Sequence, residues 1–174
     1  LAGVISQEEA FAAVDWNVIF LLIGMMIIAN TIRHTGVFTW LAVMAARIGG
    51  GRPLRVLIIM CIFTAVASAL LDNVTTVVLV APVTIYLAGV LRVSPIPLLL
   101  AEVFASNIGG AATLIGDPPN ILIGSAAHIN FIDFAGAMLP ISVLCMVALI
   151  GLIWVFWRKE LRSSDETIEA GFDR

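Results

Sequence analysis

Long apolar stretches separated by short polar or basic segments make up most of this chain. A helix needs about 20 apolar residues to cross the roughly 30 Å hydrocarbon layer of a bilayer. Residues 16–32 and 134–157 both meet this length without an internal charge, and the second ends directly before Arg158 and Lys159. We therefore predict one membrane helix at 16–32 and another at 134–157.

Two other apolar stretches are interrupted by polar residues. Asp72 is the only charged residue between Val56 and Ala88, a run too long for one crossing and too short for two crossings with a wet loop. The pattern predicts a re-entrant hairpin at 54–91, formed by two half-depth helices that meet at Asp72-Asn73. The stretch 97–127 has a centre rich in glycine and proline, which predicts either a second hairpin or one interrupted helix.

The positions of the basic residues decide between these two alternatives. Arginines flank both ends of the predicted hairpin, and by the positive-inside rule these ends face the cytoplasm. The residues concerned are Arg33, Arg47, Arg52, Arg55 and Arg92. If 97–127 crosses once, the last helix returns Arg158, Lys159 and Arg162 to the same face, so we predict one interrupted crossing. The short segment 38–48 is flanked by glycines and is expected to lie along the cytoplasmic surface or to link rigid parts.

Composition agrees with a multi-pass protein of the plasma membrane or the bacterial inner membrane. Hydrophobic residues make up 61% and charged residues 12% of the chain, whereas soluble domains carry about 25% charged residues. No basic cluster suggests nucleic acid, and no nucleophile–base pair or metal-ligand spacing suggests an enzyme. Cys61 and Cys145 lie in apolar runs, which argues against a disulfide framework. The chain begins at Leu1 without an initiator methionine, so we expect a fragment of a longer protein.

Helix breaks at membrane depth have a specific chemistry. Unpaired backbone groups cost several kcal/mol each in lipid, so broken helices persist only inside protein or beside water. Helix N-termini at such breaks attract anions, and exposed carbonyls can coordinate cations. Paired discontinuous helices are typical of secondary transporters. A passive channel would also expose carbonyls, and a structural membrane subunit is a third alternative.

Polar residues at and near the two breaks are the candidate site. Three acids lie at apparent membrane depth without a lysine or arginine, which favours a coupling cation or proton at Asp72, Asp117 and Glu102. Neutral groups for the substrate are Asn73, Thr75, Thr76, Asn107, Gly109, Gly110, Thr113 and Asn120. Structural roles compete with these: Asn73 and Thr75 as turn caps, Asp117 as the N-cap of a helix that starts at Pro118, and Glu102 as a hydrogen-bonded neutral acid.

The two breaks resemble a known family. The residues that carry the resemblance are Leu71-Asp72-Asn73-Val74-Thr75-Thr76, then Ala81-Pro82-Val83-Thr84, Glu102, Asn107 to Thr113, and Ile115-Gly116-Asp117-Pro118-Pro119-Asn120. They resemble the ion transporter superfamily with its citrate-transporter-like domain, and the match covers roughly residues 14–160. The closest branch is the group of P-protein, arsenite permeases and sodium/proton antiporters.

This resemblance implies a fold and a function. Family members are secondary transporters built from two inverted repeats, usually dimeric, with an elevator-type movement; this chain would be the N-terminal repeat. We therefore expect transport of a small inorganic or organic anion coupled to Na⁺ or H⁺, with no other cofactor. Sodium/proton antiport and arsenite efflux are the alternatives, and a passive channel is less favoured. The expected partners are the lipid bilayer, the C-terminal repeat and a second copy of the protein. The Asp72-Asn73-Val74-Thr75 tip differs from the Ser-Asn-Thr tip of dicarboxylate carriers.

Overall fold

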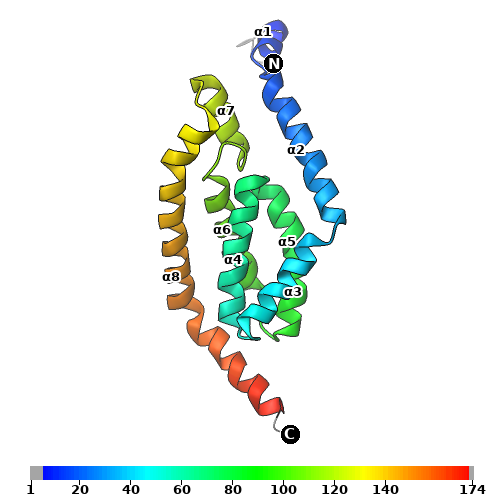
Figure 1. The fold of residues 1–174 in the computed structure, drawn as a ribbon, viewed down its shortest axis with the longest axis vertical. Coiled ribbons are helices and arrows are strands. Elements are labelled where there is room, and N and C mark those ends of the chain that lie inside the picture. Colours follow the sequence, from blue (N-terminus) through cyan, green and yellow to red (C-terminus); the bar gives the residue numbers. More distant parts are fainter. Residues whose placement is uncertain (1–5, 173–174) are drawn as a thin grey trace.

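The computed structural model describes residues 6–172, and the regular elements in this range are all helices (Figure 1). In chain order they are α1 (Gln7–Ala12), α2 (Trp16–His34), α3 (Val37–Gly49), α4 (Pro53–Leu70), α5 (Asn73–Val90), α6 (Pro95–Gly110), α7 (Pro118–Ala127) and α8 (Phe131–Phe172). The predicted all-α class is confirmed. The side chains of Arg33, Arg158, Lys159 and Arg162, on which the predicted orientation depends, lie outside the described residues.

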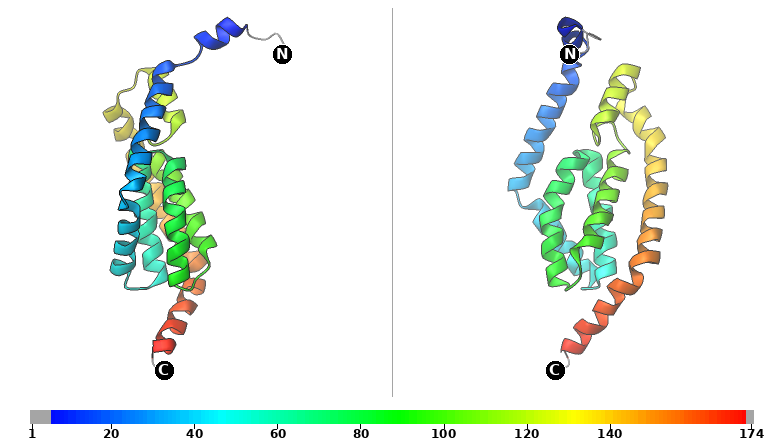
Figure 2. Two further views of the ribbon diagram at one scale, coloured as in Figure 1. Left: turned by 90° about the vertical axis from the view of Figure 1, so that its right-hand side faces the viewer. Right: turned by 180° about the vertical axis from the view of Figure 1, so that it is seen from behind.

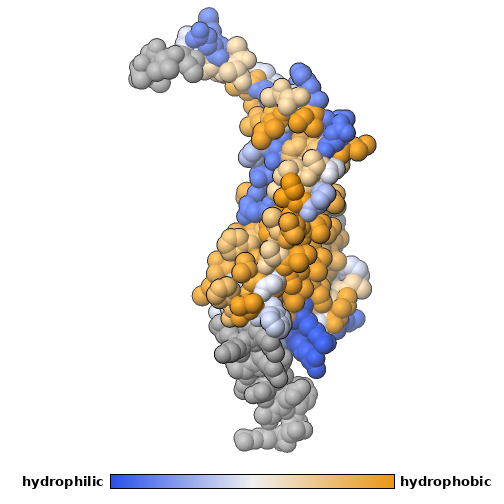
Figure 3. Space-filling model, turned by 90° about the vertical axis from the view of Figure 1, so that its left-hand side faces the viewer, coloured by the Kyte–Doolittle hydropathy of each residue, from blue (hydrophilic) through white to orange (hydrophobic). Residues whose placement is uncertain are grey.

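Several of these helices are long and apolar enough to cross a bilayer. They are α4, α5 and the Phe131–Trp157 part of α8; α2 and α3 form a fourth candidate as a pair bent by 61°. Figure 3 shows hydrophobic residues covering most of the middle of one face, with hydrophilic residues gathered above it and at its lower edge. This distribution is that of a multi-pass membrane protein.

Helices α4 and α5 form the hairpin that the sequence predicts. Pro53 occupies the first turn of α4, where its missing N–H is not needed, and only Leu71 and Asp72 separate α4 from α5. Each helix has 18 residues, which corresponds to about 27 Å at 1.5 Å per residue. This is longer than the half-depth helices expected from the sequence, so the re-entrant course of the hairpin stays a prediction.

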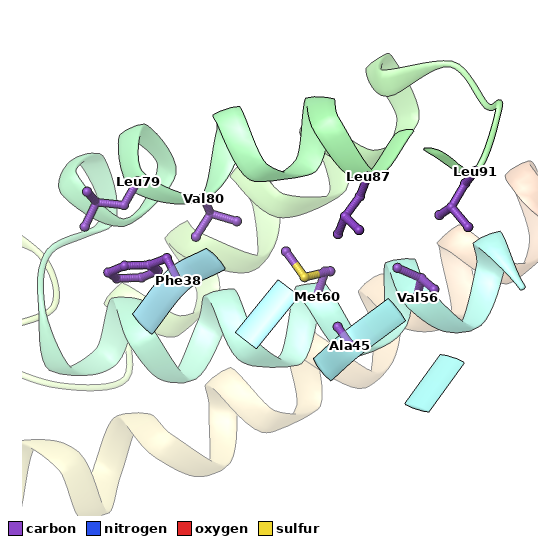
Figure 4. Close-up of a cluster of buried hydrophobic side chains, with 8 residues drawn as sticks. All are labelled: Phe38, Ala45, Val56, Met60, Leu79, Val80, Leu87 and Leu91. Carbon is purple, nitrogen blue, oxygen red and sulfur yellow. The ribbon is translucent and has the colours of Figure 1, made fainter. Parts of the chain in front are cut away.

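Helix α3 packs against both arms of the hairpin, and its predicted place along the cytoplasmic surface or as a link between rigid parts stays a prediction. Its Phe38 and Ala45 are 8% and 3% exposed and join a cluster with Met60 of α4 and Val80 of α5 (Figure 4). The other members of this cluster are Val56, Leu79, Leu87 and Leu91.

Helix α6 lies against both arms of the hairpin, and α8 covers α4 and α6 on the other side. A second cluster of buried side chains fills the space between these helices: Leu57, Cys61, Ala88, Leu98, Ala101, Ala105, Leu149 and Ile153. Figures 1 and 2 show α7 and the first turns of α8 continuing beyond the tip of the hairpin. The tip and the α6–α7 break therefore lie within the length of the molecule, not at its end.

Candidate functional site

The hairpin tip is closed by Asp72, which is the N-cap of α5. Its backbone is extended (φ −130°, ψ 157°), and its carboxylate accepts a hydrogen bond from the Thr75 N–H at 2.7 Å. An Asp at this position satisfies one of the free N–H groups at the start of a helix and places negative charge at its positive end. The half-buried carboxylate thus has a structural role, and this role uses only one of its two oxygens.

The α6–α7 break is held open by side chains that bind its backbone. The Thr113 hydroxyl accepts from the Gly116 N–H at 3.1 Å and donates to the Ala69 carbonyl of α4 at 2.6 Å. The Asn120 amide donates to the Gly110 and Thr113 carbonyls at 3.2 and 2.9 Å. Thr113 and Asn120 therefore satisfy much of the unwound backbone, which the low dielectric of a membrane protein requires.

Asp117 stands at the N-cap of α7, as predicted, but its side chain makes no capping hydrogen bond. The reason is chemical: Pro118 and Pro119 have no N–H, and the Asn120 N–H donates to the Asp117 carbonyl. The carboxylate is consequently released from capping. It lies beside the Asn73 side chain and within electrostatic reach of Asp72.

The tip and the break are hydrogen-bonded to each other through Asn73. Its N–H donates to the Gly116 carbonyl at 3.2 Å, and its side-chain amide donates to the Asn107 side chain at 3.2 Å. Its carbonyl accepts from the Ser106 hydroxyl at 2.8 Å, and Ser68 of α4 donates to the Ser106 carbonyl at 2.7 Å. Residues 33 to 43 positions apart in sequence thus form one polar unit, the tip–break junction.

Glycines permit this close approach. A Cβ on Gly109 would stand 2.1 Å from the Ala65 carbonyl oxygen of α4. A Cβ on Gly110 would stand 2.6 Å from the Gly116 carbonyl oxygen and 3.3 Å from the Cβ of Asn73. The predicted site glycines are therefore places where two backbones meet, so any larger residue would separate the break from the hairpin.

The charge at this junction is negative. Asp72 and Asp117 both lie here, whereas the arginines with described side chains lie toward the opposite end of the hairpin, at the end of α3, around the start of α4 and after α5. In addition, the Asn73 side-chain oxygen is buried and has no hydrogen-bond partner among the described residues. Two carboxylates and one unpaired amide oxygen are the donor chemistry of a hard cation or a proton.

Two predicted residues lie apart from this unit. Thr76 is fully buried inside the hairpin, and its hydroxyl has no partner in the described part of the chain. Glu102 accepts a hydrogen bond from Thr84 of α5 at 2.6 Å, between α5 and α6. Ser68 was not predicted as a member of the site. The sequence gives no spacing signal for it, because α4 ends at Leu70, between Ser68 and Asp72.

These features define a class: an all-α, multi-pass membrane protein whose hairpin tip binds an interrupted helix, as in membrane transporters. The chain belongs to the citrate transporter family: the family model described as "Citrate transporter" matches residues 1–168. The resemblance noted in the sequence is thereby confirmed, and the family is one of transporters, not of enzymes.

Named relatives agree with this assignment. An uncharacterized transporter of Mycobacterium tuberculosis strain H37Rv is 53% identical over 156 residues, which is 87% of this chain and 36% of that protein. A 46 kDa membrane protein of Mycobacterium leprae is 49% identical over 154 residues, 86% of this chain and 36% of that protein. The human P protein is 42% identical over 158 residues, 87% of this chain and 19% of that protein. The chain thus spans about a third or less of the length of these relatives.

Proposed function

We propose that the carrier containing this chain is a secondary active transporter of a small inorganic or organic anion, coupled to Na⁺ or H⁺. The observation that carries the proposal is the direct bonding of the hairpin tip to the α6–α7 break through Asn73. Because these bonds join two discontinuous elements, the hairpin and the break move as one body. That body would expose its site alternately to the two sides of the membrane, together with a C-terminal repeat and within a homodimer.

The residues of the junction divide by chemistry. Asp72, Asp117 and the carbonyls of the break bind the coupling cation, since carboxylate and carbonyl oxygens suit hard cations. Asn107 is exposed; its amide donates one N–H to the Val103 carbonyl and offers the other to the anion, with Asn73 and Thr75 beside the tip. The backbone of the break also faces the substrate, and its shape is set by Thr113, Asn120, Gly109 and Gly110.

A second candidate is sodium/proton antiport, with arsenite efflux as a further member of the same group. The proximity of Asp72 to Asp117 favours a cation as the transported species, because two carboxylates at one site repel an anion. In this variant the two acids exchange Na⁺ for H⁺, and no anion enters the junction. A flux that does not depend on the gradient of a second ion would instead indicate a channel.

The test uses the full-length protein in proteoliposomes. Uptake of arsenite, carboxylates, sulfate, Cl⁻ and Na⁺ is measured under imposed pH and Na⁺ gradients, with wild type, Asp117→Ala and the control Asp133→Ala. Asp133 is an exposed acid at the start of α8, outside the junction. We expect Asp117→Ala to abolish coupled flux and Asp133→Ala to preserve it. Unchanged uptake and coupling in Asp117→Ala would remove this residue from the mechanism.

A further inference from the structure

Two fully buried serines meet where α4 packs on α6. Ser68 lies in the last turn of α4 and Ser106 near the end of α6, and both are 0% exposed. The Ser68 hydroxyl donates to the Ser106 carbonyl at 2.7 Å, and the Ser106 hydroxyl donates to the Asn73 carbonyl at 2.8 Å. A path of two hydrogen bonds therefore leads from α4 through α6 to the first residue of α5.

Both hydroxyls bond to another element and not to their own helix. A serine inside a helix commonly satisfies its hydroxyl on the carbonyl one turn earlier, which keeps the bond local. Here the partners are 38 and 33 positions away in sequence. Each bond therefore fixes one element against another, which an alanine in the same place would not do.

The backbone of Asn73 is bound on both sides as a result. Its N–H donates to the Gly116 carbonyl of the break at 3.2 Å, and its carbonyl accepts from Ser106. Gly116 also packs against Ser68, because a Cβ on Gly116 would stand 2.8 Å from the Ser68 carbonyl oxygen. The two serines and the break thus hold the start of α5 from opposite sides.

An anchored backbone limits where the Asn73 side chain can point. Only its two side-chain torsion angles remain free, and its amide nitrogen donates to the Asn107 side chain at 3.2 Å. The side chain lies beside Asp117, and its oxygen is buried without a partner among the described residues. A buried amide oxygen without a partner is costly unless a ligand binds it. The placement of this oxygen therefore concerns the site as well as the fold.

We propose that Ser106 is a positioning residue for the cation site of the junction, and that Ser68 acts through Ser106. By holding the Asn73 backbone, Ser106 orders the side chain beside Asp117 before a cation arrives. Without this bond, binding must first order the tip, which lowers the affinity for the cation but not the rate of the loaded carrier. This inference rests on the proposed function and adds two residues that set its cation affinity.

The first test measures transport by the full-length protein in proteoliposomes. The variants are Ser106→Ala, Ser68→Ala, both together, and the control Thr64→Val. Thr64 is also fully buried on α4, but its hydroxyl has no partner in the described part of the chain, so a valine of the same shape removes no bond. Uptake of the ion that wild type transports is measured against external Na⁺ at fixed pH, and against pH at fixed Na⁺.

We expect Ser106→Ala to raise the half-saturating cation concentration about three- to tenfold, the effect of one lost hydrogen bond, with a maximal rate within about twofold of wild type. Ser68→Ala should raise it less, and the double variant should not exceed Ser106→Ala, because Ser68 acts only through Ser106. Thr64→Val should match wild type. A reduced maximal rate with unchanged half-saturation, or equality of Ser106→Ala and Thr64→Val, overturns the inference and leaves transport intact.

A second measurement does not depend on transport. Deuterium exchange of backbone N–H groups is followed by mass spectrometry in the detergent-solubilised full-length protein. Ser106→Ala should accelerate exchange about three- to tenfold at the tip, at Asn73 and Thr75, and leave the middle of α4 unchanged. Equal acceleration along α4 and α6 would indicate general loosening, and no acceleration would show that Ser106 does not hold the tip; either result refutes the positioning role. If wild type transports none of the tested ions, the proposed function fails, and the exchange pattern alone decides whether Ser106 orders Asn73.

Discussion

The contact between α6 and α4 at Gly109 gives the sharpest prediction about stability. A Cβ at this position would stand 2.1 Å from the Ala65 carbonyl oxygen and 2.5 Å from the Ala65 Cα, both backbone atoms that cannot rotate away. Ordinary contact begins at 3.4 Å, so Gly109→Ala requires the helices to separate locally by 3.4 − 2.1 = 1.3 Å. Gly109 lies between Ser106 and Thr113, whose hydrogen bonds join α6 and the break to α4. The separation therefore acts on both bonds.

The magnitude follows from what the separation breaks. Overpacking of this kind costs about 1–3 kcal/mol. The bond from Thr113 to the Ala69 carbonyl, one turn along α4 from Ala65, would be stretched by this separation, and its loss would cost about 1 kcal/mol. A gain in helix propensity of up to about 1 kcal/mol offsets part of this. We expect Gly109→Ala to destabilise the protein by about 1–3 kcal/mol.

The matched control is Gly151→Ala in α8, where a Cβ meets nothing within 4 Å. Its expected effect is neutral or a gain of up to about 1 kcal/mol. Both variants of the full-length protein are heated at one scan rate in the same detergent, with loss of the folded peak in size-exclusion chromatography as the readout, because membrane proteins often unfold irreversibly. If Gly109→Ala melts at or above the temperature of Gly151→Ala, the close α4–α6 approach is wrong.

Two further predictions use the same heating assay. Asn120→Ala removes the donor to the Gly110 and Thr113 carbonyls and should destabilise the protein by about 1–3 kcal/mol, while wild-type stability would show that other groups satisfy these carbonyls. The Ser125 hydroxyl donates to Asp15 at 2.6 Å and, as the main cause, lowers the pKa of this exposed carboxyl below its ordinary 3.8. Because the folded pKa is the lower one, the stabilisation is complete above about pH 4 and is lost as pH falls through the folded value. Ser125→Ala should therefore lose a small part of the stability near neutral pH and show a weaker decline in acid, and an unchanged acid profile would refute this.

The sequence predicted the hairpin because its signals are local. A single charged residue in a long apolar run, followed by an amide and two hydroxyls, marks both the turn and the N-cap of α5. The position of α7 was predictable for the same reason, since Asp117-Pro118 is a helix start. The packing of α3 was not predictable, because an amphipathic helix of this length suits a membrane surface and a protein groove equally well, and only the placement of Phe38 against α4 and α5 decides.

The partners within the site were harder to predict than its members. The sequence identified Asn73 and Asn107 as polar residues at two breaks, but their hydrogen bond depends on how α6 crosses the hairpin. Thr113 illustrates the limit: it was predicted among the neutral groups for the substrate, and in the structure its hydroxyl bonds the Ala69 carbonyl and the Gly116 N–H. Residues that hold a break open and residues that bind a ligand have the same chemistry, so the sequence alone cannot separate the two roles.

The distribution of contacts indicates where the carrier would move. Helix α6 packs extensively on α4 and α5, and the Asn73 junction adds hydrogen bonds across the same interface, so these elements form one rigid body. Helix α2 touches this body only lightly, and its polar link to α7 is the exposed hydrogen bond between Asp15 and Ser125. An exposed hydrogen bond contributes little to stability because water replaces it on opening. Movement is therefore least costly between α2 and the body of α4, α5 and α6, to which the Asn120 hydrogen bonds join the start of α7.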